Sequence, residues 1–260
     1  MTFRFTGTGT SVGVPQIGCS CKVCTSADPR DRRNRCGAYV TAADGTSFLI
    51  DTPPEMRLAC LAYGIGKVDS VVLTHAHMDH VAGFDDVRRF NTINGNTCMT
   101  CHAMAETVEQ MHGIFPYVGK DGSADGLFRP KIEFDSSDAF VLGSVNISRL
   151  RIEHGFPCCG YLMEESGRRI AYLSDCHVIP DETIEMIRGV DVMVLDCLRE
   201  REHPTHLTLG RAMRYLERIQ PGRAYLIHMC HDFTHEEWLA KLVGTNVEPA
   251  YDGLEISCQQ

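Results

Sequence analysis

The feature that most constrains the fold of this chain is a run of metal-binding side-chain types at residues 75–80. The run contains His75, His77, Asp79 and His80. It follows residues 70–74, Ser-Val-Val-Leu-Thr, whose β-branched and apolar character predicts a buried strand. Side chains two apart on extended backbone point the same way, so His75 and His77 can bind one divalent ion. Asp79 and His80 enter the following turn and can bind a second ion, so we expect a strand that ends in a dinuclear metal site.

Strand-like and helix-like patterns alternate along the whole sequence. Strands are predicted at residues 3–6, 47–51, 70–74, 145–152, 169–174, 191–196 and 223–227. Helices are predicted at residues 54–63, 105–112, 181–187 and 207–219. The alternation indicates an α/β fold, and because no repeat or linker interrupts it, we expect one domain over residues 1–260. Residues 113–137 lack a periodic pattern and are predicted to form a surface loop or lid.

Glycines cluster just after the first predicted strand, in residues 7–13, Gly-Thr-Gly-Thr-Ser-Val-Gly. A phosphate-binding P-loop would continue with Lys and Ser or Thr, which are missing here. The cluster therefore predicts a tight turn that requires glycine.

Charge and composition exclude several classes of protein. The sequence has 25 Lys and Arg against 34 Asp and Glu, a net charge of −9, so nucleic acids and anionic membranes are not expected as partners. Residues 30–35 form a basic cluster that can reach a substrate phosphate or a second copy of the chain, which leaves a homodimer open. Neither the apolar segment of a secretory signal, about 7–15 residues long, nor an apolar run of about 18 residues is present, so we expect a cytoplasmic location.

Cysteine is abundant, with thirteen residues in the chain. Disulfides are rare in the cytoplasm, so free thiols and metal ligands are the expected roles. Cys19, Cys21 and Cys24 form a C-x-C-x-x-C motif, a strong metal-site pattern that calls for a fourth ligand. His231 is the leading candidate for that ligand, and Cys36 and Cys230 are alternatives. A zinc ion closed in by four protein ligands would be structural.

The His-x-His-x-Asp-His motif of residues 75–80 resembles that of the metallo-β-lactamase superfamily. The resemblance implies a four-layer αββα sandwich with a metal site along one edge. It also implies the remaining ligands, which are His154, Asp175 and His228, each after a predicted strand. By this similarity one metal ion is bound by His75, His77 and His154, the other by Asp79, His80 and His228, and Asp175 bridges them. Asp51 and Asp196 would orient imidazoles of the site.

Three motifs together resemble those of the PhnP-type phosphodiesterase family within this superfamily. They are the C-x-C-x-x-C motif, the His-x-His-x-Asp-His motif and the His-x-x-His pair formed by His228 and His231. The resemblance runs from Gly7 to residues 252–256. Related scaffolds include a pyrroloquinoline quinone biosynthesis protein and the tRNA 3′-processing endonucleases. The chain lacks a long basic arm of the kind that holds tRNA in those endonucleases, so a small phosphorylated substrate is expected.

The resemblance implies a metal-dependent phosphodiesterase that acts on a small cyclic phosphodiester, such as a phosphoribosyl 1,2-cyclic phosphate. A hydroxide held between two Zn²⁺, Mn²⁺ or Fe²⁺ ions would attack phosphorus. His206 would contact the substrate and protonate the leaving oxygen, and Asp79 is assigned to catalysis as well as to the metal site. Arg88 is expected to pair with a substrate phosphate. The alternatives are a thioester or lactone hydrolase of the same fold and a zinc-stabilised accessory protein.

Overall fold

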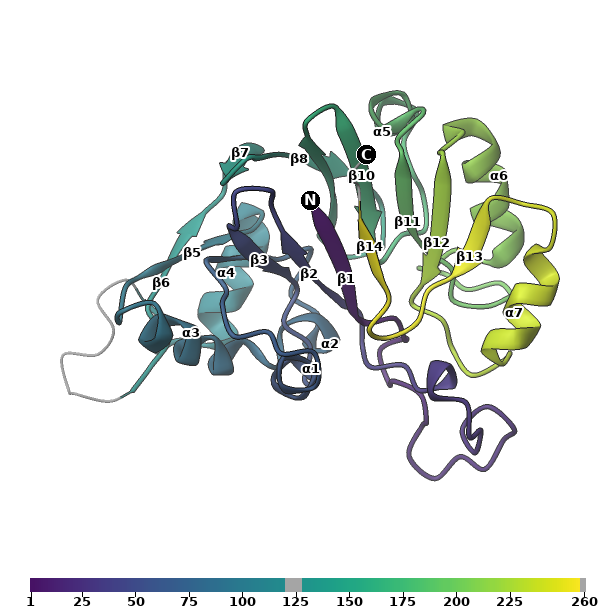
Figure 1. The fold of residues 1–260 in the computed structure, drawn as a ribbon, viewed down its shortest axis with the longest axis horizontal. Helices are drawn as coiled ribbons and strands as arrows, with labels where there is room; N and C mark the ends of the chain where they lie inside the picture. The colour runs from purple at the N-terminus through teal and green to yellow at the C-terminus, as the bar shows by residue number, and fades with distance from the viewer. Residues whose placement is uncertain (120–127, 258–260) are drawn as a thin grey trace.

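The computed structural model describes residues 1–119 and 128–257, which form two facing β-sheets of seven strands each (Figure 1). In the first sheet, the strand order is β14 (Glu255–Ser257), β1 (Thr2–Gly7), β2 (Gly37–Thr41), β3 (Ser47–Ile50), β4 (Ser70–Val72), β5 (Met99–His102) and β6 (Ile132–Asp135). In the second, it is β13 (Val247–Pro249), β12 (Arg223–Ile227), β11 (Val192–Asp196), β10 (Arg168–Leu173), β9 (Cys159–Glu165), β8 (Val145–Arg151) and β7 (Ala139–Leu142). Strands β3–β6 are parallel to one another, as are β10–β13.

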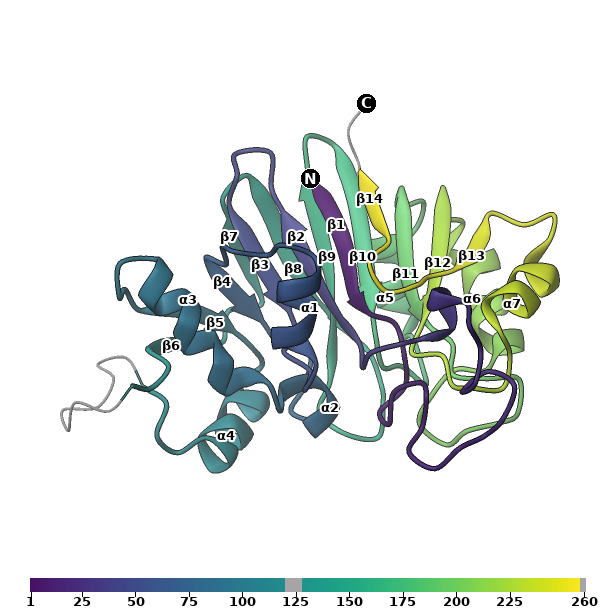
Figure 2. The same ribbon diagram turned by 60° about the horizontal axis from the view of Figure 1, so that its bottom comes forward.

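Helices cover the outer face of each sheet, which gives four layers (Figures 1 and 2). On the first sheet they are α1 (Met56–Ala62), α3 (Arg88–Ile93) and α4 (Ala105–Ile114), with α2 (Met78–Val81) and the 3-10 turn η2 (Phe84–Val87) beside them. On the second they are α5 (Asp181–Ile187), α6 (Leu209–Ile219) and α7 (His235–Leu242). The αββα sandwich is thereby confirmed. Among the helices described, none is long and apolar enough to span a bilayer.

The alternation of side chains along the strands explains this layering. In β3, Phe48 and Ile50 point to the core between the sheets, where Phe3 and Phe5 also lie, whereas Leu49 points to the helices. Phe48, Leu49 and Ile50 are all buried, because both faces of the strand are covered. A strand covered on both faces needs apolar residues on both, which the sequence supplies.

Most predicted elements match observed ones to within one or two residues. The helix predicted at 181–187 is α5, and the strand predicted at 223–227 is β12. The loop predicted at 113–137 is wrong in part, because β6 lies within it and pairs with β5. β6 is a four-residue edge strand, too short to give a clear periodic signal. Residues 120–127 of the predicted loop and Cys258 lie outside the described residues.

Between β1 and β2 the chain leaves the first sheet in a long excursion that contains the glycine-rich turn and the 3-10 turn η1 (Pro29–Asp31) (Figure 2). Glycine is required at position 7, where a Cβ atom would lie 1.9 Å from the Arg35 carbonyl oxygen. The excursion is held against the segment after β12, because the Met229 N–H donates to the Thr8 carbonyl at 3.1 Å and the Thr10 N–H donates to the Met229 carbonyl at 3.3 Å. The amino-terminal segment thus packs beside residue 228.

Candidate metal centre

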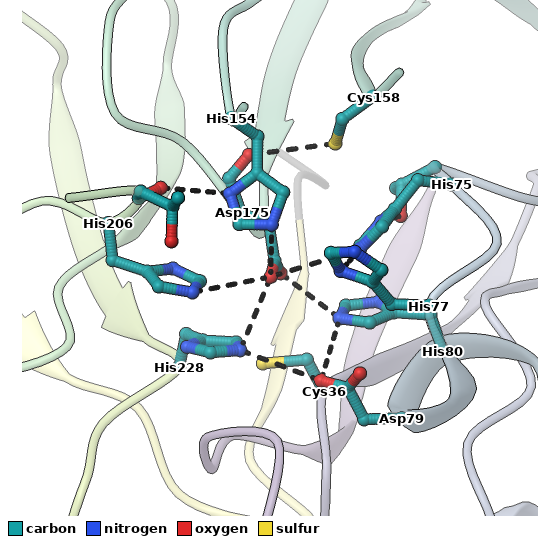
Figure 3. A network of polar contacts seen from close by, with 12 residues as sticks. Cys36, His75, His77, Asp79, His80, His154, Cys158, Asp175, His206 and His228 are labelled. Carbon is teal, nitrogen blue, oxygen red and sulfur yellow. Dashed lines mark hydrogen bonds and ion pairs between the residues drawn. The ribbon is translucent and has the colours of Figure 1, made fainter. Parts of the chain in front are cut away.

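Asp175 lies at the centre of a buried cluster of histidines (Figure 3). Its Oδ2 atom is 3.4 Å from Nε2 of His228, 3.6 Å from Nε2 of His154 and 3.9 Å from Nε2 of His75. Its Oδ1 atom is 3.1 Å from Nε2 of His80. One carboxylate therefore faces four imidazoles from three separate segments, as a bridging ligand must.

The ligand atoms fall into the two groups expected from the sequence. The first group is His75, His77, His154 and Asp175, and the second is Asp79, His80, His228 and Asp175. Within each group the ligand atoms lie within 4.8 Å of one another. The shared carboxylate and the separate histidine sets fit a dinuclear metal site.

The fold brings these residues together because each follows a strand or begins a helix at the same edge of the sandwich. His75 follows β4, His154 follows β8, Asp175 follows β10 and His228 follows β12. The carboxyl ends of parallel strands meet at one edge, where loops carry functional side chains. The extended backbone of His77 precedes α2, whose first turn carries Asp79 and His80.

Hydrogen bonds to the second ring nitrogens orient the imidazoles. Nδ1 of His80 is 2.7 Å from Asp51 Oδ2, and Nδ1 of His154 is 2.8 Å from the Thr205 carbonyl oxygen. Nδ1 of His75 lies 3.0 Å from the hydroxyl of Thr74, which itself donates to Asp51. Such contacts turn each Nε2 toward the centre, where Nε2 of His75 lies 2.9 Å from Nδ1 of His77. The orienting role predicted for Asp51 is consistent with these contacts.

Polar atoms of the centre are buried without hydrogen-bond partners among the described residues. They are Nε2 of His80, both ring nitrogens of His228 and Oδ1 of Asp175, and the 3.1 Å approach of Oδ1 to His80 Nε2 does not have the geometry of a hydrogen bond. An unpaired buried polar atom is costly and rare, so several in one place call for a further group. Divalent ions would satisfy imidazole nitrogens and carboxylate oxygens together, and the residues therefore fit a metal centre.

Burial and nearby carboxylates shift the pKa values of two histidines in the centre in opposite directions. Burial lowers the pKa of His75 well below its usual range, which keeps its imidazole in the neutral form that binds metal. Burial also opposes charge on His80, but the carboxylates of Asp175 and Asp51 raise the pKa of His80 well above its usual range. The carboxylates around His80 thus favour a positive charge where a metal ion would lie.

Two residues of the centre have uncommon backbone conformations. Asp51 has φ 62° and His228 has φ 59°, in the left-handed region that non-glycine residues rarely adopt. The Asp51 side chain accepts hydrogen bonds from the Thr74 N–H at 2.8 Å and from His80 Nδ1 at 2.7 Å, which hold the residue in place. Backbone strain of this kind concentrates at functional sites.

His206 borders the centre but is bound to a carboxylate of its own. Its Nδ1 atom is 2.9 Å from Asp196 Oδ2, and its Nε2 atom is 3.9 Å from Asp175 Oδ2. Asp196, His206 and His228 could also hold a metal ion by proximity. However, the distance from His206 Nδ1 to Asp196 leaves room for a proton and not for an ion between them. Asp196 thus orients the candidate general acid and not a ligand imidazole, and His206 Nε2 faces the centre.

The C-x-C-x-x-C motif forms a second metal-binding group with His231. Nδ1 of His231 is 3.4 Å from Sγ of Cys19, 3.4 Å from Sγ of Cys21 and 3.3 Å from Sγ of Cys24. A backbone N–H of Cys24 lowers the pKa of Cys21 to about 6, whereas burial and the neighbouring thiols raise the pKa of Cys24 to about 11. Thiolates this close repel one another, and a cation offsets the repulsion. The cluster fits a structural zinc ion.

The alternative fourth ligands lie outside this group. The Cys36 thiol is fully buried and donates to the Gly9 carbonyl at 3.3 Å. The Cys230 carbonyl accepts from the buried guanidinium of Arg33 at 2.6 Å. His231 is therefore the residue that the structure brings to the three thiols.

Arg88 has neighbours outside the metal centre. Its guanidinium is 3.0 Å from the Asp85 carboxylate and donates to the Phe128 carbonyl at 3.2 Å. Its substrate-binding role stays a prediction.

Sequence reasoning missed three features of the centre. The carbonyl of Thr205 and the hydroxyl of Thr74 both orient ligands. The ring of Phe156 lies 4.3 Å from the ring of His77. Thr74 could have been inferred from its position beside His75, but nothing in the sequence pattern places Phe156 against a ligand that follows a strand of the other sheet.

Known proteins of similar sequence identify the family. Residues 46–229 match the beta-lactamase superfamily domain. The chain belongs to the metallo-β-lactamase superfamily. This assignment agrees with the two mixed sheets, the flanking helices and the His/Asp clusters at one edge of the sandwich.

Individual members of the superfamily resemble the chain over most of its length. A crystal structure of a diphosphatase from the PhnP family is 36% identical, covers 99% of this chain and 98% of its own, and superposes with a TM-score of 0.88. Zn²⁺-bound PqqB from Methylobacterium extorquens shares the fold, with a TM-score of 0.81 and 18% sequence identity. That match covers 99% of this chain and 100% of the PqqB chain. An octanoyltransferase of Porphyromonas gingivalis is 34% identical over 96% of this chain, which spans only 50% of that protein's length. The superfamily, the site and the diphosphatase relative together indicate a metal-dependent hydrolase.

Proposed function

We propose that the protein is a metal-dependent phosphodiesterase that hydrolyses a small cyclic phosphodiester, such as a ribose or nucleoside cyclic phosphate. The observation that carries the proposal is the pair of ligand groups that share Asp175, with the hydrogen-bonded pair of His206 and Asp196 beside them. The two ligand groups supply positions for two cations, and His206 supplies a proton donor. A phosphodiester needs both, because its negative charge repels a nucleophile and its leaving alkoxide needs a proton.

Two divalent ions, bound by the two ligand groups, would acidify a water molecule and neutralise the phosphoryl oxygens. Asp175 would hold both ions, and Asp51 and the Thr205 carbonyl would fix the imidazoles of His80 and His154. Asp79 is a ligand in this proposal, and its further catalytic role stays a prediction. The metals are proposed to be Zn²⁺, Mn²⁺ or Fe²⁺, since mixed His and Asp sites accept all three.

His206 is the proposed general acid. A water molecule would add to phosphorus and release one proton to the solvent as the bond from phosphorus to the leaving oxygen breaks. The proton on His206 Nε2 would pass to that oxygen, and a proton from the solvent would then restore His206. Nε2 is suited to this step because the bond from Nδ1 to Asp196 points the other ring edge at the centre. The fully buried Asp196 carboxylate, 2.9 Å from Nδ1, holds the imidazole ring in the orientation that this transfer needs.

Similarity to the PhnP-family diphosphatase supports phosphorus chemistry, since that relative is 36% identical over nearly the whole of both chains. Similarity to an octanoyltransferase gives a second candidate, the hydrolysis of a thioester or related carbonyl compound. A dinuclear centre can also attack a carbonyl carbon. Phosphodiester hydrolysis is favoured because the diphosphatase is covered almost completely and the octanoyltransferase only by half.

The test combines metal analysis with kinetics. Purified protein should contain about three metal ions per chain and hydrolyse ribose 1,2-cyclic phosphate 5-phosphate or 2′,3′-cyclic nucleotides, with octanoyl thioesters as the competing substrate class. His206→Ala should lower kcat on phosphodiesters by about 10²–10⁴-fold at unchanged metal content. His112→Ala, the same change at an exposed position on α4, is the matched control.

Fully loaded protein that turns over thioesters but no phosphodiester would establish the second candidate. An unchanged biological function after loss of Asp175 would point to an accessory protein instead.

A further inference from the structure

A cavity of about 750 Å³ opens beside the first ligand group. The cavity is lined by the start of α4, the end of β8 and the segment that leads to β9. Its volume is within the range of about 300–1,000 Å³ that is common for small-molecule sites. A ribose ring with one cyclic phosphate would fill only part of it.

Phe156 lines this cavity and also contacts the first ligand group. Its ring is 4.3 Å from the ring of His77, with 31° between the planes, and 6.2 Å from the ring of His75. Because His77 covers one face of the ring, Phe156 offers its remaining surface to the cavity. A planar group stacked there would lie next to a phosphate held at the centre.

The charges around the cavity argue against a second phosphate as its occupant. The guanidinium of Arg149 is 2.7 Å from the Asp138 carboxylate and also donates to the Ala103 carbonyl at 3.1 Å. Arg151 lies 3.4 Å from Glu182, and Glu106 adds a further negative charge to the lining. Both arginines thus already have acidic neighbours, so the cavity has no excess of positive charge.

The remaining lining suits a ring with an apolar face and a polar edge. Met104, Ile152 and Pro157 give apolar surface near Phe156, and Ser136 and Glu106 supply hydrogen-bonding groups. A nucleobase has this combination, because every base has a π-face and a rim of donors and acceptors.

We propose that this cavity is a nucleobase subsite, in which the base stacks on Phe156 while the cyclic phosphate of the same nucleotide lies at the metal centre. The inference rests on the proposed function and sharpens it, since it favours nucleoside cyclic phosphates over ribose phosphates without a base.

The test is the ratio of kcat/KM for 2′,3′-cyclic AMP to kcat/KM for ribose 1,2-cyclic phosphate 5-phosphate, measured on metal-loaded protein. Phe156→Leu should lower this ratio by about 5- to 150-fold, the effect of losing one base–aromatic stack. The ratio cancels any change that acts through His77, because both substrates use the metal centre. Phe134→Leu is the matched control, since the Phe134 ring is partly buried on β6, as Phe156 is in its loop, and does not line the cavity.

Phe156→Tyr and Phe156→Trp should restore the ratio, because they restore an aromatic face. Titration of Phe156→Trp with adenosine 3′-monophosphate should quench tryptophan emission, whereas ribose 5-phosphate should not. An unchanged ratio in Phe156→Leu, or no recovery with either aromatic residue, overturns the subsite and leaves the proposed function intact. Wild-type protein with full metal content that hydrolyses neither substrate overturns the proposed function itself.

Discussion

Asp252 is expected to make the stability of the fold depend on pH. Its carboxylate is half-buried just before β14 of the first sheet, where it accepts from the Asn34 N–H at 2.6 Å and from the Thr8 hydroxyl at 2.8 Å. Burial raises the pKa of Asp252 from 3.8 to about 7, although the two donors and the charge of Arg33 oppose the shift. Tyr63 is a further neighbour, and the charge of Asp252 contributes to the raised pKa of that phenol.

The direction of the pH effect follows from the raised pKa. The folded protein holds the Asp252 proton more tightly than the unfolded chain does, so the stabilisation is complete below pH 3.8 and is lost as the pH rises through about 7. Between pH 5.5 and pH 7.5 a group with these two pKa values loses about 2 kcal/mol of stabilisation. Asp252→Asn has nearly the same shape and no titration, so it should remove this loss.

Urea denaturation of zinc-loaded wild-type and Asp252→Asn proteins at pH 5.5 and pH 7.5 measures the effect. The free energy of unfolding should fall with pH by about 2 kcal/mol more in the wild type than in the variant, because all other titrations cancel in the difference. If the two proteins lose equal stability over this range, the carboxyl is ionised throughout and its burial does not control its pKa.

Further predictions concern the metal sites. Asp175→Ala should lower the metal content from about three ions per chain to about one, measured by mass spectrometry, with loss of hydrolysis, because both ligand groups share this carboxylate. Asp196→Asn should lower kcat with little change in KM or metal content, because it removes the charge that orients His206. Cys24→Ala should release the structural zinc, detected with a chromogenic chelator, and lower the melting temperature, whereas Cys98→Ala, a matched change at an exposed cysteine, should do neither.

The sequence predicts much of the site because the ligands follow strands. His75, Asp175 and His228 come directly after or within two residues of buried runs, so their shared edge could be expected from an α/β pattern. The αββα arrangement itself was predicted only because the His-x-His-x-Asp-His motif resembles that of the superfamily. The pairing of Asp196 with His206 could not be predicted, because nine residues of loop and turn separate them and only the folded chain brings their side chains to 2.9 Å.

The missed elements have physical reasons as well. β9 is central in its sheet and buried on nearly all positions, so its sequence, Cys-Gly-Tyr-Leu-Met-Glu-Glu, shows no alternation of apolar and polar residues. β6 is a short edge strand. Phe156 precedes β9 in a loop, and its contact with His77 depends on how the two sheets face each other. Contacts of this kind are properties of the packing and leave no local pattern.

The two metal sites are joined by one short segment, and this explains why the amino-terminal excursion is part of the site. His228 and His231 are three residues apart, and between them the Met229 N–H bonds the Thr8 carbonyl while the Arg33 guanidinium bonds the Cys230 carbonyl at 2.6 Å. These two contacts hold a segment whose first residue, His228, has a left-handed backbone conformation. Because the thiols of the excursion close on His231, a zinc ion there would fix the end of the segment that positions His228. The cluster of three cysteines and His231 therefore supports the second ligand group, which contains His228, more directly than the first, which is built on β4 and β8.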